Sequence, residues 1–190
     1  MSASSPPQDW TQDRFQVAKS SQNPSAGKAG RRRPSGLSAA RLLAVQALYQ
    51  ISLNKKPPAD VIAEFLEHRV EEDLEGLKHA SVNRPLLSEL VEGVSAQADD
   101  LDDMLAAVLD EDWTIERVEI LLLSLLRTAA FELSERLEVP ARVVISEYVD
   151  LANAFFGGQE TAFVNGMLDR LAHVLRAEEF GETAALPDIT

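Results

Sequence analysis

The chain has 190 residues, of which 45% are hydrophobic, enough for one domain with a sizeable core. It contains no cysteine, which excludes disulfide-stapled secreted folds, thiolate metal sites and cysteine nucleophiles. Its net charge of −13 is uneven: residues 1–37 hold six Lys or Arg against two Asp (+4), and the remainder holds 12 against 29 acidic residues (−17). An acidic body repels nucleic acid at long range, so RNA binding would need a local basic patch or a partner.

No apolar run approaches the roughly 20 residues that a membrane-spanning helix needs. The first 33 residues also lack the apolar region of a secretory signal. Because the absence of cysteine suits a reducing compartment, these features together predict a cytoplasmic protein that does not contact a membrane.

The first segment, residues 1–36, is rich in Ser, Pro, Gln, Gly and Ala and poor in bulky apolar residues. Such a composition cannot bury enough surface to offset the entropy lost on ordering. We therefore predict a disordered basic extension over 1–37, an all-α domain over 38–177 and a flexible tail over 178–190.

Every segment of the predicted domain has helical periodicity, and none alternates like a strand. Ser38 is expected to cap the first helix, and Thr114 the most apolar one, which we predict to be the core. Val139-Pro140 and Gly157-Gly158 are expected to end the two helices that precede them. The predicted ranges are 39–53, 59–71, 85–94 with a continuation or a restart through 109, 115–137, 141–156 and 160–177.

No pattern typical of catalysis or of a bound metal is present. The sequence has no phosphate-binding glycine loop, dinucleotide fingerprint or nucleophile elbow. His68, His79 and His173 are isolated from one another. The acidic runs 99–103 and 110–112 do not match a calcium loop, and solvated helix faces explain them better. We therefore expect no enzyme activity, no cofactor and no metal site.

The most suggestive short feature is the run Arg31, Arg32 and Arg33. Each guanidinium can bind a phosphate through two parallel hydrogen bonds, so consecutive arginines favour a nucleic-acid contact. A solvated basic tail is the plainer interpretation, and the charge pattern alone favours it.

Two segments, 40–49 (ARLLAVQALY) and 163–169 (FVNGMLD), resemble signature segments of the NusB antitermination family. Segments 126–133, 139–140 and 144–152 resemble the family in the expected order, so the match covers roughly 38–175. The resemblance implies a single domain of about seven helices in two packed bundles. It further implies binding to boxA RNA of ribosomal RNA operons together with NusE, a small-subunit ribosomal protein. The pair would join other Nus factors on RNA polymerase and suppress premature termination.

The resemblance also implies an RNA surface made from the basic N-terminus, the first helix and the start of the last helix. Arginines would contact phosphates, aromatic rings would stack on unpaired bases, and amides would recognise base edges. The residues carried over are Arg31, Arg32, Arg33, Arg41, Gln46, Tyr49, Phe163 and Asn165.

Each of these residues has a structural alternative. Tyr49 and Phe163 could be core residues, and Arg41 could pair with an acidic neighbour. Asn165-Gly166 could serve close helix packing or tie down the preceding loop. A further arginine, Arg127, stands in an apolar helix, and we expect it to pair with a buried carboxylate such as Glu132 or Glu147, because an unpaired buried charge is costly.

The chain departs from the family pattern in two places. Residues 34–37 separate Arg31–Arg33 from the first helix, so a flexible arm would have to carry them to RNA at an entropic cost. The NusE surface should carry an acidic residue five positions before Arg127, but Leu122 stands there and Glu119 lies three residues earlier. Glu119 and Leu122 are therefore our candidates for the partner interface.

Two other classes of function were weighed. A similar helical domain precedes some ribosomal-RNA cytosine methyltransferases, but those need a catalytic cysteine and a cofactor-binding α/β domain, and this chain has neither. The other alternative is a helical protein-interaction module without intrinsic RNA binding. Apolar surface on the first helix could serve the NusE contact or a homodimer.

Overall fold

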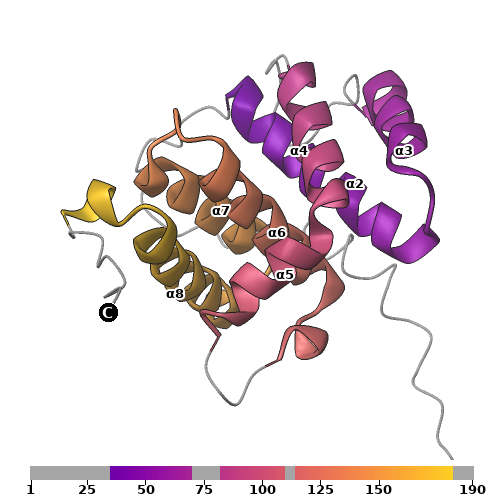
Figure 1. The fold of residues 1–190 in the computed structure, drawn as a ribbon. Helices are drawn as coiled ribbons and strands as arrows, with labels where there is room; N and C mark the ends of the chain where they lie inside the picture. Colours follow the sequence, from indigo (N-terminus) through magenta and orange to yellow (C-terminus); the bar gives the residue numbers. More distant parts are fainter. Residues whose placement is uncertain (1–34, 70–81, 110–113, 182–190) are drawn as a thin grey trace, which may run out of the picture. The chain divides into compact units, whose positions relative to one another are not determined.

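The computed structural model describes residues 35–69, 82–109 and 114–181. These residues belong to one compact unit, and all their regular elements are helical (Figure 1). The predicted all-α class is confirmed. The elements are α2 (Gly36–Asn54), α3 (Pro58–Glu64) with a π-helical turn η1 (Phe65–Arg69), α4 (Arg84–Ala96), α5 (Ala98–Ala106), a 3₁₀ turn η2 (Ile115–Arg117), α6 (Ile120–Glu135), α7 (Ala141–Phe155), α8 (Gly158–Leu175) and a 3₁₀ turn η3 (Ala177–Phe180).

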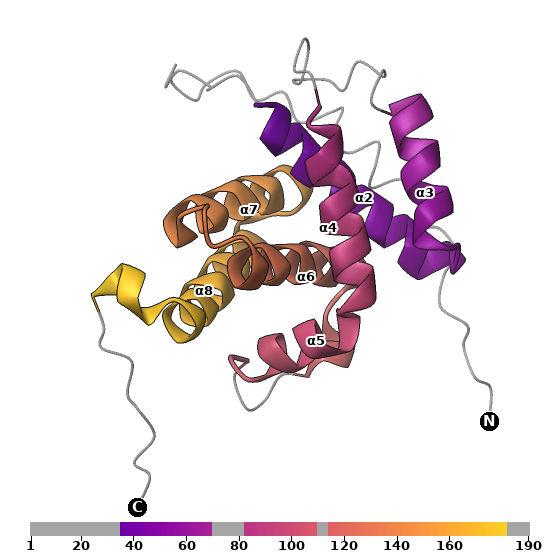
Figure 2. The same cartoon turned by 45° about the horizontal axis from the view of Figure 1, so that its top comes forward.

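The helices form two bundles, as expected. In the first, α2, α3 and α4 pack on one another, and in the second α6, α7 and α8 do so, with α5 against α6 (Figure 2). Helix α6 joins the bundles, since it also packs on α2 and α4. Its side chains Leu125, Leu126, Ala129 and Leu133 are all fully buried. The most apolar segment of the sequence therefore is the core of the described domain.

Helices α4 and α6 cross closely at Gly93. A Cβ built on Gly93 would overlap Cζ of Phe131, whose ring is buried. Real Cβ atoms do not approach a carbon so closely, so the crossing requires a residue without a side chain. Glycine weakens a helix interior, and here the close packing of the two helices compensates.

Two predicted helix starts are wrong. The cap of α2 is Ser35, whose side chain accepts a hydrogen bond from the Ser38 N–H at 3.1 Å, and Ser38 already lies within the helix. Thr114 precedes the short turn η2 without a capping hydrogen bond. The chain is extended at Val118, which is buried, and α6 begins at Ile120. Burying Val118 interrupts what the sequence pattern presents as one continuous helix.

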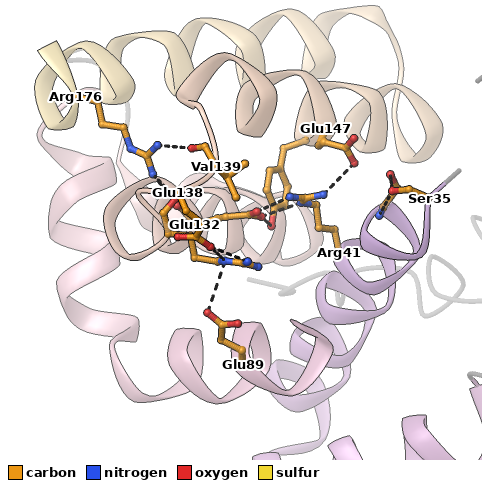
Figure 3. A network of polar contacts seen from close by, with 11 residues as sticks. Ser35, Arg41, Glu89, Glu132, Glu138, Val139, Glu147 and Arg176 are labelled. Atoms are coloured by element: carbon orange, nitrogen blue, oxygen red, sulfur yellow. Dashed lines mark hydrogen bonds and ion pairs between the residues drawn. The ribbon is translucent and has the colours of Figure 1, made fainter. Parts of the chain in front are cut away.

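The far end of α6 is closed by an arginine from beyond α8. Arg176, 5% exposed, donates from Nε to the Leu133 carbonyl at 2.7 Å and from Nη1 to the Val139 carbonyl at 2.6 Å (Figure 3). Its Nη2 donates to the Glu132 and Arg136 carbonyls, both at 3.0 Å. The last carbonyls of a helix lack partners within it, and here one guanidinium supplies them.

Candidate nucleic-acid interface

The first predicted site residue, Arg41 on α2, lies in the interior between the two bundles. It is 3% exposed and donates from Nε to Oε2 of Glu132 at 2.8 Å, with a second short hydrogen bond from Nη2 to Oε1 (Figure 3). Tyr148 Oη also donates to Glu132 Oε2, at 3.0 Å, and Arg41 Nη1 donates to Glu147 Oε2 at 3.3 Å. These four residues form the buried quartet, which ties α2 to α6 and α7.

The quartet shifts the pKa values of two of its members. Burial lowers the pKa of Arg41, but its hydrogen bond to Glu132 and the negative charge of that carboxylate outweigh this, and the net pKa is raised. Burial, and next the charge of Glu132, raise the pKa of Tyr148 well above its ordinary value. Arg41 therefore stays charged and Tyr148 neutral, which stabilises the contact between the bundles.

The prediction that Arg41 contacts a phosphate is corrected by this geometry. Its guanidinium faces the protein interior, and an RNA phosphate could reach it only if the quartet came apart. The pairing predicted for Arg127 is also wrong: Arg127 binds Asp102 of α5 through Nε at 2.7 Å and through Nη2. The carboxylates expected to pair with Arg127 are those that hold Arg41. Arg127 has a structural partner as expected, but on a different helix.

The other predicted RNA residues lie at or near the surface. Gln46 and Tyr49 of α2 and Phe163 of α8 are half-buried, and Asn165 is exposed. A Cβ built on Gly166 would meet nothing within 4 Å, so this glycine does not serve close helix packing. The helix face beside Asn165 is therefore open to a ligand. Arg31, Arg32 and Arg33 lie outside the described residues.

A groove of ≈ 290 Å³ brings three of the predicted residues together. Glu119 and Leu122 come from the start of α6, and Phe163 comes from the first half of α8. Leu122 is 8% exposed, whereas Glu119 is exposed. The groove is lined by Arg117, Val118, Glu119, Leu122, Gln159, Glu160 and Phe163.

The groove combines apolar residues (Val118, Leu122 and Phe163) with charged ones (Arg117, Glu119 and Glu160), a combination that suits the binding of a partner's side chain. Sequence reasoning named its α6 side and Phe163 but missed Gln159 and Glu160. The sequence gives little indication of these two residues. Both follow Gly157, the N-cap of α8, and they belong to no recognisable motif. Among the described residues, no group of three His, Asp or Glu side chains could hold a metal ion, and no described helix has the length and apolar character to span a membrane.

Comparison with known proteins defines the class. The family model described as NusB family matches residues 38–173, and this chain belongs to that family. A transcription antitermination protein NusB of Sphingopyxis alaskensis is 42% identical over 145 residues, which are 76% of this chain and 97% of that protein. One from Bradyrhizobium sp. is 40% identical over 167 residues, 87% and 99% of the two chains. The resemblance found in the sequence is therefore confirmed.

Solved structures agree on the fold. NusB of T. maritima matches with a TM-score of 0.63 at 24% identity, covering 76% of this chain and 96% of that one. A structure of the antitermination factors NusB and NusE in complex with double-stranded RNA matches with a TM-score of 0.58 at 22% identity, covering 72% and 96%. At these identities the matches establish the shared helical architecture.

Proposed function

We propose that this chain is a non-enzymatic transcription antitermination factor. It binds boxA RNA of ribosomal RNA operons together with NusE, and within a complex of RNA polymerase and other Nus factors it suppresses premature termination. It works in the cytoplasm, where bacterial transcription takes place. The observation that carries this proposal is the 42% identity along 97% of a relative whose name is transcription antitermination protein NusB.

The groove between α6 and α8 supports a partner that completes the RNA surface. Glu119 and Leu122, the candidates for the NusE contact, share this groove with Phe163, a candidate for RNA stacking. A partner seated on the α6 side would therefore lie next to RNA bound at Phe163. Since the whole chain carries a charge of −13, a second, basic protein at this position would also offset long-range repulsion of RNA.

The proposed RNA contacts now exclude Arg41. Arg31, Arg32 and Arg33 bind phosphates, Tyr49 or Phe163 stacks on an unpaired base, and Gln46 or Asn165 recognises a base edge. Tyr49 and Phe163 are half-buried, so part of each ring is accessible to a base, and Phe163 also packs against the core.

The deciding experiment measures binding of a fluorescent boxA RNA at two salt concentrations, with and without NusE. We expect tighter, sequence-selective binding in the presence of NusE, weakened by salt. Replacing Arg31, Arg32 and Arg33 together by Gln should reduce the slope of log Kobs against log[salt] by about 0.7 for each lost phosphate contact. Arg142→Gln is the control, because Arg142 is an exposed cation of α7 that lines neither the groove nor the α2 N-terminus.

Selective RNA binding in neither condition, by a protein shown to be folded, would overturn the proposal. The chain would then be a protein-interaction module that binds NusE or another protein without RNA. An unchanged salt slope in the triple Gln variant would leave the function standing but remove these arginines from the RNA surface.

A further inference from the structure

A second cavity, of ≈ 330 Å³, lies where the end of α2 meets α3, the junction of α4 and α5, and α6. Its volume is within the range of small-molecule sites, which begins at about 300 Å³. None of the residues predicted to bind RNA or a partner lines it. The lining residues are Leu48, Ile51, Ser52, Lys55, Lys56, Pro58, Val94, Ser95, Ala98, Ser124 and Arg127.

Its charge is positive in an acidic protein. Lys55, Lys56 and Arg127 line the cavity, and none of the described residues that line it is acidic. Lys56 Nζ pairs with Glu64 Oε2 at 3.3 Å, and Arg127 pairs with Asp102. Two of the three cations are thus compensated by carboxylates beside the cavity. Lys55 adds one positive charge, and within residues 35–69, 82–109 and 114–181 it has no carboxylate partner.

The position of Lys55 is unfavourable for a lysine. It follows the last residue of α2 with φ 54°, and it is the one described residue other than glycine with a positive φ. Glycine is preferred at this left-handed position after a helix, because any Cβ crowds the backbone there. Strain of this kind persists only where the surrounding structure enforces it, and it is frequent at functional sites. Here the backbone turn directs the lysine to the mouth of the cavity.

Inside the cavity, polar and apolar groups are mixed. Ser95 Oγ is buried and has no hydrogen-bond partner among the residues that the structure describes, which is costly for a hydroxyl unless a ligand supplies one. Ser52 and Ser124 donate to the carbonyls of Leu48 and Ile120, so their oxygens can still accept. Leu48, Ile51, Pro58, Val94 and Ala98 form apolar walls.

We infer that this cavity binds one nucleotide of single-stranded RNA. The phosphodiester lies at Lys55, beside Arg127, whose Nε and Nη2 bind Asp102, and the base packs against the apolar walls within reach of Ser95. One uncompensated positive charge matches the single negative charge of a phosphodiester. The terminal phosphate of a free nucleoside phosphate carries a charge of about −1.5 to −2, so part of its negative charge would remain uncompensated in this cavity.

This inference rests on the proposed function and extends it. Arg31–Arg33 precede the beginning of α2, and Lys55 follows its end. The 19 residues of α2 span about 28 Å at 1.5 Å per residue. RNA that binds near the beginning of α2 would therefore reach the cavity only if it continued along the helix, so nucleotides flanking boxA should contribute to affinity.

The test compares boxA RNA with a longer RNA that keeps its natural flanking nucleotides, using the full chain with NusE. We expect the longer RNA to bind more tightly. Lys55→Gly should abolish this gain in affinity and reduce the salt slope by about 0.7. The variant should be as stable as the wild-type protein or more stable, because glycine suits the left-handed position. Ala98→Leu should fill the cavity and lower affinity about fivefold or more without changing the salt slope. Arg142→Gln should keep the gain.

The outcomes separate the two proposals. If wild-type protein binds neither RNA, the proposed function fails. If it binds boxA RNA but flanking nucleotides add nothing, or Lys55→Gly keeps the gain, the cavity inference alone fails. A different result would be that adenosine monophosphate shifts the Ser95 and Ala98 amide resonances while Lys55→Gly leaves RNA affinity unchanged. That result would assign the cavity to free nucleotides and overturn the inference. If Lys55→Gly weakened NusE binding in the absence of RNA, Lys55 would belong to the protein interface, and the cavity inference would be overturned as well.

Discussion

Glu132 is the residue on which the contact between the bundles most depends. It is fully buried, and it accepts hydrogen bonds from both Arg41 and Tyr148. Without Glu132, the buried charge of Arg41 would keep only the partly exposed carboxylate of Glu147, 3.3 Å from Nη1. Glu132→Ala should therefore lower the free energy of unfolding by about 3–5 kcal/mol, measured by urea denaturation.

Glu147 provides the matched comparison. Its side chain is 29% exposed and lies 3.3 Å from Arg41 Nη1, so water can replace much of the interaction. Glu147→Gln should cost about 1 kcal/mol or less. If both variants lowered the free energy of unfolding by the same amount, Glu132 would not be the main partner that compensates the buried charge of Arg41.

Tyr148 should make the protein sensitive to alkaline pH. Its pKa in the folded state lies above its ordinary value of about 10, first because of burial and next because of the charge of Glu132. The unfolded chain therefore loses this proton at lower pH than the folded protein. The stabilisation is complete below about pH 10 and is lost as pH rises through the folded-state pKa.

Tyr148→Phe should flatten this alkaline decline in the free energy of unfolding, followed by urea denaturation across the pH range. The chain has two tyrosines, so Tyr49→Phe is the control and should retain the decline. The same decline in the Tyr148→Phe protein would assign the effect to another group.

At the scale of the helices, the crossing of α4 and α6 depends on Gly93. Gly93→Ala should force the Phe131 ring aside and cost about 1–3 kcal/mol of stability, as overpacked cores do. Gly166→Ala is the matched control in another helix, where the new Cβ meets nothing within 4 Å. It should be neutral or stabilising by up to about 1 kcal/mol, because alanine favours helix. Thermal unfolding of both variants checks this, and equal effects would contradict the close crossing.

The helices themselves could be predicted because their apolar periodicity is local. Predictions failed where the structure depends on contacts distant in sequence. Arg41 and Glu132 are 91 residues apart, and no local pattern could show that Arg41 rather than Arg127 pairs with Glu132. The start of α6 was misjudged because burying Val118 overrides the pattern around it. The groove could be predicted in part: Phe163 lies in a segment that resembles the family, and Leu122 and Glu119 lie at or near the position expected for the NusE contact. The cavity beside Lys55 has no sequence signal.

At the scale of the whole molecule, we propose that residues 38–177 fold as one domain. The shared core runs through both bundles by way of α6, so neither bundle should unfold separately. Limited digestion with trypsin should remove the N-terminal extension first, at sites up to Arg33, and leave one resistant fragment. Mass spectrometry of the fragment checks the boundary. An early cut within α2, for example after Arg41, would contradict it.

The guanidinium of Arg176 has a consequence for the order of events during synthesis. Its carbonyl partners on α6 and in the following turn lie 37–44 residues earlier in the chain. On the ribosome, α6 emerges well before Arg176, with its last carbonyls still hydrated. The hydrogen bonds that close the end of α6 can therefore form only after α8 has been made. The core helix of this protein is completed last, by nearly the last residue of the described domain.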